Sequence, residues 1–158
     1  METMEKRWQD ACAEQVHIIR PEHINGSGRL FGGQLLMWID ELAGIVATRH
    51  SESRITTASI DNLNFKKAVF LNDTVVLIGK ITHVGRSSME VRVDTYVETL
   101  DGMRHVINRA YVVMVAIDEE GKAVPVPGLI VGTESEKAEW EAGEKRYQLR
   151  KQRRLEGF

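Results

Sequence analysis

The sequence is poor in cysteine and contains no long apolar run. Its 158 residues include a single cysteine, Cys12, which excludes an internal disulfide bond and fits a reducing compartment. No apolar stretch is long enough to span a bilayer. The first residues, Met1–Gln15, lack the apolar centre of a signal peptide. These absences predict a cytoplasmic protein that does not insert into a membrane.

The chain also lacks a large excess of charge. Its formal net charge is −2, with 42% hydrophobic and 28% charged residues, an ordinary composition for a globular domain of this length. Such a balance provides no overall attraction to nucleic acid or to an anionic membrane. We therefore expect no nucleic-acid partner, and any site for phosphate must be a local basic patch.

Several catalytic motifs are missing. There is no Gly-x-Ser-x-Gly elbow, so a serine hydrolase is unsupported. There is no P-loop, and Gly26-x-Gly28 does not follow the strand pattern of a dinucleotide-binding unit. The five histidines are scattered without metal-ligand spacing to cysteine or aspartate. We therefore predict neither a metal site nor a cofactor.

Hydrophobic periodicity indicates one apolar helix and a set of strands. The helix is predicted from about Gly33 to His50, after a short strand at Gln15–Arg20 and a glycine-containing loop. Four longer strands are predicted after it, at Ile55–Phe65, Thr74–Val84, Ser88–Leu100 and Arg104–Asp118. Short turns such as Asp101-Gly102 indicate an antiparallel sheet. A single curved sheet would bury a helix that is apolar nearly all round, which predicts an α+β fold.

Two polar segments flank this region. Residues 1–14 are predicted to be disordered or to form a short helix, residues 15–132 form the domain, and residues 133–158 form a charged tail. Within the tail, Glu134–Arg154 has many charges and few large apolar residues. It is predicted to be a solvated helix laid loosely on the body or on a neighbouring molecule.

One carboxylate interrupts the apolar helix. The residues three and four positions from Asp40 are apolar or small: Leu36, Met37, Ala43 and Gly44. A carboxylate that loses water there has a raised pKa, which suits acid–base chemistry. The alternative is a structural carboxylate that faces solvent or pairs with a base such as Arg49. Glu41, the next residue, points about 100° away and is not assigned a catalytic role.

The motifs around this helix resemble a known family. They include the Gly32-Gly33 pair, Ile39-Asp40-Glu41, Thr57-Ala58-Ser59-Ile60-Asp61, Gly85-Arg86-Ser87-Ser88 and Val124-Pro-Val-Pro127. In this order and spacing they are similar to the hotdog-fold acyl-CoA thioesterases, in the branch that holds the brain acyl-CoA hydrolase and bacterial short- and medium-chain enzymes. The resemblance covers about Arg20 to Tyr147. It implies a long helix wrapped by a curved antiparallel sheet.

The resemblance also implies an activity and a mode of assembly. Members of the family hydrolyse acyl-CoA to free CoA and a carboxylic acid without a metal. Their subunits pair edge to edge, and this branch commonly forms trimers of dimers. For this chain we therefore expect an acyl-CoA substrate of short to medium or broad chain length, and self-association as a dimer and as a hexamer.

Thioester hydrolysis needs a group that attacks or activates water, and a site for the developing oxyanion. Asp40 is the candidate general base or nucleophile, and the sequence leaves both mechanisms open. Gly32 and Gly33 stand where the loop enters the helix, so their N–H groups lack helical partners and no side chain blocks a carbonyl. Gly33 N–H, with Gln34 N–H as a second donor, is the predicted oxyanion site.

The assignment of further residues to the site depends more heavily on the resemblance. Asn25 matches a position that faces the aspartate of the partner subunit; a plain Asx turn is the alternative. Thr57 offers a hydroxyl, although threonine is also a common strand former. Arg86, Ser87 and Ser88 suit the phosphates or the pantetheine arm of CoA; a polar hairpin turn is the alternative.

Two rival functions remain on the same fold. A hotdog domain could bind acyl-CoA without hydrolysing it. A hydratase or dehydratase would need a catalytic histidine paired with an acid near the helix, whereas His50 stands at the far end of the predicted helix. Fold alone does not separate these functions.

Overall fold

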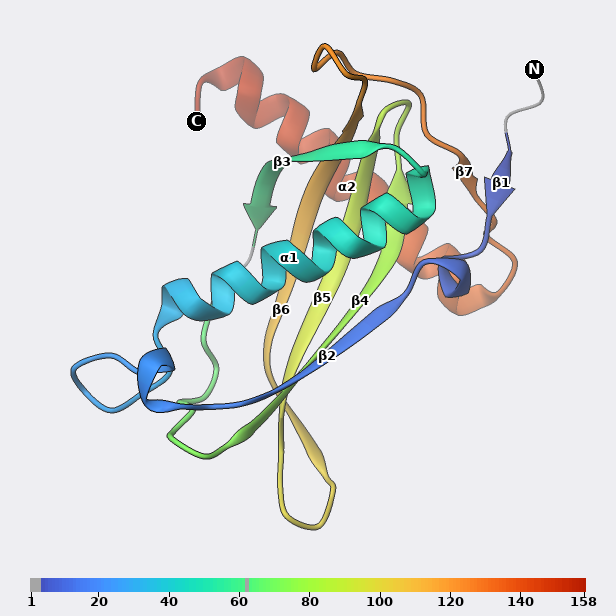
Figure 1. Ribbon diagram of the computed structural model, residues 1–158. Helices are drawn as coiled ribbons and strands as arrows, with labels where there is room; N and C mark the ends of the chain where they lie inside the picture. Colours follow the sequence, from blue (N-terminus) through green and yellow to red (C-terminus); the bar gives the residue numbers. More distant parts are fainter. Residues whose placement is uncertain (1–3, 62) are drawn as a thin grey trace.

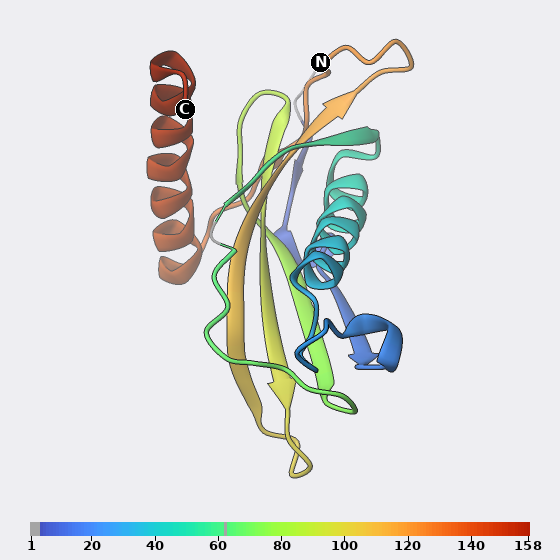
Figure 2. The ribbon, with the colours of Figure 1, turned by 90° about the vertical axis from the view of Figure 1, so that its left-hand side faces the viewer.

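The computed structural model describes residues 4–61 and 63–158. A long helix, α1 (Gly32–Ser51), lies in the concave face of a curved sheet, and a second helix, α2 (Glu134–Glu156), covers part of the opposite face (Figures 1 and 2). The predicted α+β hotdog architecture is thus the observed one.

Five antiparallel strands form the sheet in the order β2-β4-β5-β6-β3. The strands span Ala13–Ile18 (β2), Arg54–Asp61 (β3), Thr74–Val84 (β4), Ser88–Glu98 (β5) and Arg104–Ile117 (β6). The three central strands follow one another along the chain and are joined by tight turns. At the predicted Asp101-Gly102 turn, Gly102 adopts φ +83°, a conformation that glycine tolerates best. β2 and β3 therefore form the two edges.

Helix α1 is held by close packing against the sheet. Leu35, Ile39 and Leu42 are completely buried. Gly79 in β4 lets the helix approach, because a Cβ there would lie 3.1 Å from Cγ2 of Val46. The helix begins one residue earlier than predicted, at Gly32, and ends at Ser51. Packing in the core thus fixes the position of α1 on the sheet, and so determines which of its side chains face the sheet and which face outwards.

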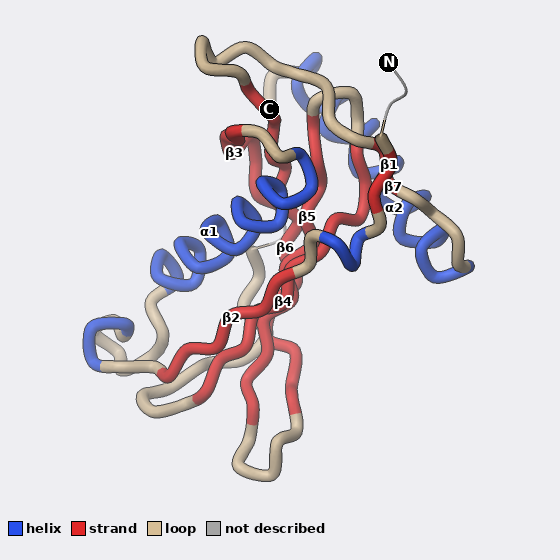
Figure 3. Tube along the Cα trace, turned by 45° about the vertical axis from the view of Figure 1, so that its right-hand side comes forward, coloured by secondary structure: helices blue, strands red, loops and turns tan. Residues whose placement is uncertain are grey.

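The flanking segments are more ordered than the sequence predicted. Glu5–Lys6 (β1) pairs in parallel with Gly128–Leu129 (β7), and a one-turn helix η1 (Trp8–Asp10) follows (Figure 3). A second turn, η2 (Pro21–His23), precedes the glycine-containing loop. The prediction of a disordered or helical start was therefore wrong for Glu5–Lys6, which takes its order from a distant part of the chain. Residues 1–3 of that segment lie outside the described residues.

Strand β3 is shorter than predicted. It ends at Asp61, opposite Tyr111, and backbone contact with β6 resumes only where Lys66 N donates to Ile107 O at 3.0 Å. A register shift between Thr57 and Ser59 bends the strand, as β-bulges do. Of the predicted Ile55–Phe65 run, residues 63–65 are not strand and residue 62 lies outside the described residues.

Helix α2 is fastened to the sheet rather than laid loosely on it. The carboxylate of Glu90 in β5 is buried and accepts two hydrogen bonds from Arg146, at 2.9 and 2.8 Å, and one from Thr82 at 2.6 Å. Burial acts to raise the pKa of Glu90, but these hydrogen bonds and the charges of Arg146 and Arg150 lower it below its ordinary value. The expectation of a loose helix was wrong, because these anchoring partners lie far away in the sequence.

Candidate active site

Asp40 of α1 is joined to the edge strand β3 through a side chain of that strand. Thr57 Oγ1 donates a hydrogen bond to Asp40 Oδ1 at 2.7 Å. The carboxylate is half-buried in the single chain. The alternative pairing with Arg49 is not formed, since Arg49 donates to the carbonyl of Cys12 at 2.8 Å. Thr57 therefore fixes one carboxylate oxygen, and no described residue forms a hydrogen bond with the other, Oδ2, which is available to a reacting molecule.

The start of α1 presents free backbone donors. In the described part of the chain, no backbone hydrogen bond uses the N–H of Gly32 or Gly33. Gln34 N–H, by contrast, donates to the Phe31 carbonyl at 3.0 Å, so the expectation that it serves as a second oxyanion donor was wrong. A Cβ on Gly33 would lie only 2.5 Å from Cε1 of Phe31. Glycine is thus needed at Gly33 for the observed position of that ring.

Asn25 forms the Asx turn that the sequence left open as its alternative role. Its Oδ1 accepts from Ser27 N at 3.0 Å, Ser27 Oγ at 2.7 Å and Arg29 N at 3.2 Å. Among the described residues, no hydrogen bond occupies its amide nitrogen or joins it to Asp40. The turn therefore orients an exposed NH₂ group. Beside it, Arg29, Lys66 and Lys67 line a basic hollow of about 350 Å³.

The Arg86-Ser87-Ser88 turn divides into two parts. The side chain of Arg86 is exposed, whereas Ser87 and Ser88 line a cavity of about 470 Å³ between β3, β6 and α2. Arg86 does not line this cavity, but Arg150, Arg153 and Arg154 of α2 do. These arginines were not among the residues predicted from the sequence. Their i, i+3, i+4 spacing on a predicted helix was the signal that could have placed them on one face.

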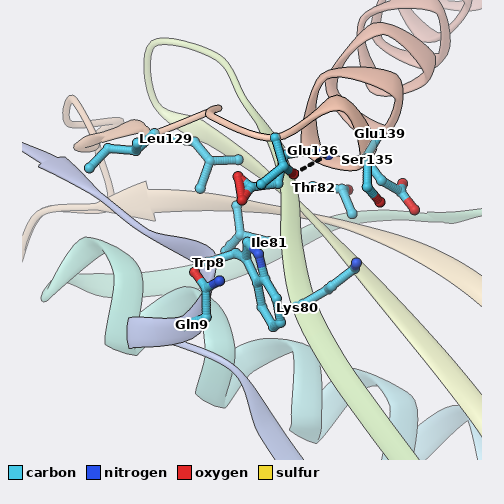
Figure 4. Close-up of a pocket in the computed structure, with 11 residues that line it drawn as sticks. Trp8, Gln9, Lys80, Ile81, Thr82, Leu129, Ser135, Glu136 and Glu139 are labelled. Carbon is cyan, nitrogen blue, oxygen red and sulfur yellow. Dashed lines mark hydrogen bonds between the residues drawn. The ribbon is translucent and has the colours of Figure 1, made fainter.

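Figure 4 shows another hollow, of about 240 Å³, between η1, β4 and the start of α2. Lys80 Nζ lies 5.1 Å from the centre of the Trp8 ring there. Burial, together with the charge of Arg92, lowers the pKa of Lys80. None of the predicted site residues lines this hollow, so it is not part of the candidate active site.

His50 lies away from Asp40 and has a structural role. It lies ten residues beyond Asp40, about 15 Å along the helix axis. Its Nε2 donates to the Pro127 carbonyl at 2.9 Å. This separation leaves His50 unable to act with Asp40 in one site of a hydratase. Within the described residues, no three His, Cys, Asp or Glu side chains gather as metal ligands, and no helix is long and apolar enough to cross a membrane.

Comparison with known proteins identifies the family. Residues 27–102 match the thioesterase superfamily. The uncharacterized acyl-CoA thioester hydrolase YkhA of Bacillus subtilis is 38% identical over 138 residues, which cover 86% of this chain and 80% of YkhA. The chain therefore belongs to the acyl-CoA thioester hydrolases of the thioesterase superfamily. The cytosolic acyl coenzyme A thioester hydrolase of Rattus norvegicus is 34% identical over 143 residues, 88% of this chain and 37% of that larger protein.

Solved structures show the same fold. An apo-hexameric acyl-CoA thioesterase superposes with a TM-score of 0.87 at 36% identity, covering 95% of this chain and 97% of the other. An acyl-CoA hydrolase of Staphylococcus aureus, in complex with butyryl-CoA and CoA, gives 0.88 at 29% identity over 97% and 94% of the two chains. The same hydrolase has been solved with an aspartate, an asparagine or a threonine replaced by alanine.

Proposed function

We propose that this protein hydrolyses acyl-CoA to CoA and a carboxylic acid. The observation that carries the proposal is the Asp40 carboxylate, held by the Thr57 hydroxyl beside an open strand edge in a chain of this family. In the Staphylococcus aureus hydrolase, the three residues exchanged for alanine are spaced along the chain as Asn25, Asp40 and Thr57 are here. That match supports the assignment of these three residues to one site.

Two routes fit the geometry of Asp40. As a general base, Oδ2 takes a proton from water, the water oxygen attacks the thioester carbon, the C–S bond breaks, and the proton passes to the CoA sulfur. As a nucleophile, Oδ2 itself attacks and expels CoA thiolate, and water then hydrolyses the mixed anhydride. In both routes the Gly33 N–H stabilises negative charge on the carbonyl oxygen, and Gly32 leaves room for the thioester.

The site is proposed to be shared between two copies of the chain. Gly33 and Asp40 are seven residues apart on one helix face, about 10 Å along the axis, which is too far for both to reach one carbonyl. Asn25 and Gly33 of one copy would instead face Asp40 and Thr57 of the other. Met37 and Ile45 on α1 are exposed apolar side chains, and β3 is an edge strand; both features support such a pairing.

The mode of assembly and the range of substrates are also proposed. We propose a dimer through β3 and a trimer of such dimers, in line with the hexameric neighbour. The substrate is a short- to medium-chain or broad range of acyl-CoA, with Arg86, Ser87 and Ser88 on the CoA portion. We propose that no metal or other cofactor takes part, and that the enzyme acts in the cytosol, as its rat relative is named.

Release of free thiol from a panel of acyl-CoA chain lengths tests the activity. Asp40→Asn should lose turnover by at least about 10²-fold while still binding substrate, because the carboxylate acts in the transition state. Glu41→Gln removes the neighbouring exposed carboxylate and should keep near-normal turnover. Thiol release by Asp40→Asn at the wild-type rate would remove Asp40 from the mechanism, and binding without release by the wild type would favour the non-catalytic module.

A further inference from the structure

His23 joins the loop that carries Asn25 to the start of helix α1. It closes the turn η2, which lies between the end of β2 and that loop (Figure 1). Its backbone N–H donates to the carbonyl of Arg20 at 2.9 Å, and its own carbonyl accepts from Phe31 N–H at 2.8 Å. Phe31 is the N-cap residue of α1. Both ends of the loop at residues 24–30 are thus tied to His23.

The imidazole of His23 acts as an acceptor in this turn. The backbone N–H of Arg20 donates to His23 Nδ1 at 3.0 Å. Because a backbone N–H can only donate, Nδ1 is unprotonated and the neutral ring carries its proton on Nε2. A second proton would place an N–H group at Nδ1 opposite the N–H of Arg20, and this hydrogen bond would be lost. Imidazole is the side chain that normally gains such a proton between pH 8 and pH 5.

The half-buried ring of His23 packs against two other elements. It contacts the indole of Trp38 in α1, with ring centres 4.9 Å apart, and His17 of β2 stacks on the same indole at 4.0 Å. Burial and then the charge of His23 lower the pKa of His17, whereas Glu41 of α1 raises it. A proton on His23 therefore makes a second proton, on His17, less favourable. The titratable and charged groups around the ring, from β2, α1 and its own turn, are His17, Glu41, Arg20 and Glu22.

We propose that His23 is a positioning residue of the candidate active site, and that a proton gained at Nδ1 releases the base of the loop. The proposal rests on the proposed hydrolysis of acyl-CoA and on the roles given there to Asn25 and Gly33. One copy of the chain supplies both of these residues to the shared site. Asn25 follows His23 by two residues, and Gly33 follows Phe31 by two residues, so the tie between His23 and Phe31 sets their separation.

The other ties of the loop do not titrate. Asn25 N–H donates to the Arg29 carbonyl and Leu30 N–H to the Val69 carbonyl, each at 2.8 Å. Loss of the hydrogen bond to Nδ1 therefore changes the direction in which the loop leaves η2 without unfolding the loop. The thioester is then held less well in its reactive position, which lowers turnover more than binding.

Two substitutions of His23 separate the acceptor from the ring. His23→Asn keeps an acceptor, Oδ1, in place of Nδ1 and does not titrate, whereas His23→Leu has no acceptor. Both variants lose the ring contact with Trp38, so the difference between them reports the acceptor. The matched control is His105→Gln, which replaces an exposed histidine outside the turn.

Thiol release from a short-chain acyl-CoA at about pH 7.5 and about pH 5.5 measures the effect. At the higher pH, kcat of His23→Leu should be about tenfold below that of His23→Asn, with KM little changed. On acidification, kcat of the wild type and of His105→Gln should fall by a larger factor than kcat of His23→Asn. Protonation of Asp40 slows all four proteins alike, so the comparison is between them. An equal fall in the wild type and His23→Asn would overturn the proposal, as would equal kcat in His23→Asn and His23→Leu at the higher pH.

Hydrogen exchange of the amides at residues 24–33 tests the same contact without catalysis. After correction with an unstructured peptide of the same sequence, exchange in the wild type should be about threefold or more faster at the lower pH. His23→Asn should show no such change. Unchanged corrected exchange in the wild type would overturn the proposal, whatever the variants do.

The two measurements also separate this proposal from the proposed function. If exchange responds to pH as expected but the wild type releases no thiol, the proposed hydrolysis is wrong and the pH-dependent tie at His23 remains. If the wild type releases thiol and its corrected exchange does not respond, the hydrolysis stands and the role given to His23 is wrong.

Discussion

Two polar side chains on α1 experience very different surroundings. Asp40 is half-buried and keeps one carboxylate oxygen free, whereas His50 is completely buried. His50 Nε2 must carry the proton, because its partner at 2.9 Å, the Pro127 carbonyl, can only accept. The other ring nitrogen, Nδ1, has no hydrogen-bond partner among the residues that the structure describes. A second proton on His50 would therefore place an uncompensated charge in the core.

This burial predicts that stability falls in mild acid. Burial lowers the pKa of His50 from its ordinary value of 6.5, with Lys6 contributing to the decrease. Above pH 6.5 the histidine is neutral in both folded and unfolded chains. Below it the unfolded chain binds the proton more readily, so stability is lost as the pH falls towards the lowered pKa. Melting temperatures at about pH 7.5 and about pH 5.5 should differ less in His50→Gln than in the wild type.

The matched control for this experiment is His105→Gln, since His105 is exposed. That variant should keep the pH dependence of the wild type. An unchanged dependence in His50→Gln would show that other groups cause the loss of stability in mild acid.

At the scale of single residues, the sequence predicted which side chains belong to the candidate site better than it predicted their orientation and contacts. Asp40 could be found because charges are rare in its helix, and Thr57 because it stands in a motif. The direction of the Asn25 amide could not be found, since it depends on three donors gathered by a turn. Arg154 was not predicted, because the cavity that it lines is formed together with residues of β3, β6 and the β4–β5 turn.

Among the elements, α2 depends on a few buried charges. Arg146→Met would remove both strong hydrogen bonds from the buried carboxylate of Glu90 and, among the described residues, leave Arg150 as its one cationic partner. Such a loss should lower the free energy of unfolding by about 3 kcal/mol, because the remaining charge is desolvated and poorly paired. Urea denaturation measures the change.

A second substitution checks the cause. Glu90→Gln in the Arg146→Met background removes the stranded charge and should recover part of the stability. If the double variant were as unstable as the sum of the two single variants, the loss would come from packing of Arg146 over the Tyr111 ring instead.

The elements that could be predicted are those whose own residues carry a clear hydrophobic pattern or clear turn signals at their ends. The bounds of β4 match their prediction because the Asn72-Asp73 turn before it and Gly85 after it mark both of its ends locally. β1 is two residues long and has no period; it exists only because β7 lies beside it. The end of β3 and the fastening of α2 were mispredicted for the same reason: their partners lie far away in the sequence.

For the whole molecule, the sharpest prediction concerns a site built from two copies. Asn25→Ala and Asp40→Ala should each be inactive alone. Dissociated together and reassembled in equal amounts, they should regain part of the activity, because one site in each mixed pair keeps both wild-type residues. Thiol release measures the recovery, with each variant reassembled alone as a control. No recovery in verified mixed pairs would place both residues in a single-chain site, as would an active monomer in sedimentation.

The order of the strands also has a consequence for synthesis on the ribosome. The two edge strands, β2 and β3, are made before the three central strands on which they pair. At about 5–20 residues per second, β3 waits several seconds for β6, its only partner in the sheet. During that time α1 lacks the part of its covering that β6 contributes. The nascent chain therefore cannot complete the covering of α1, or pair β3 into the sheet, until β6 has been made.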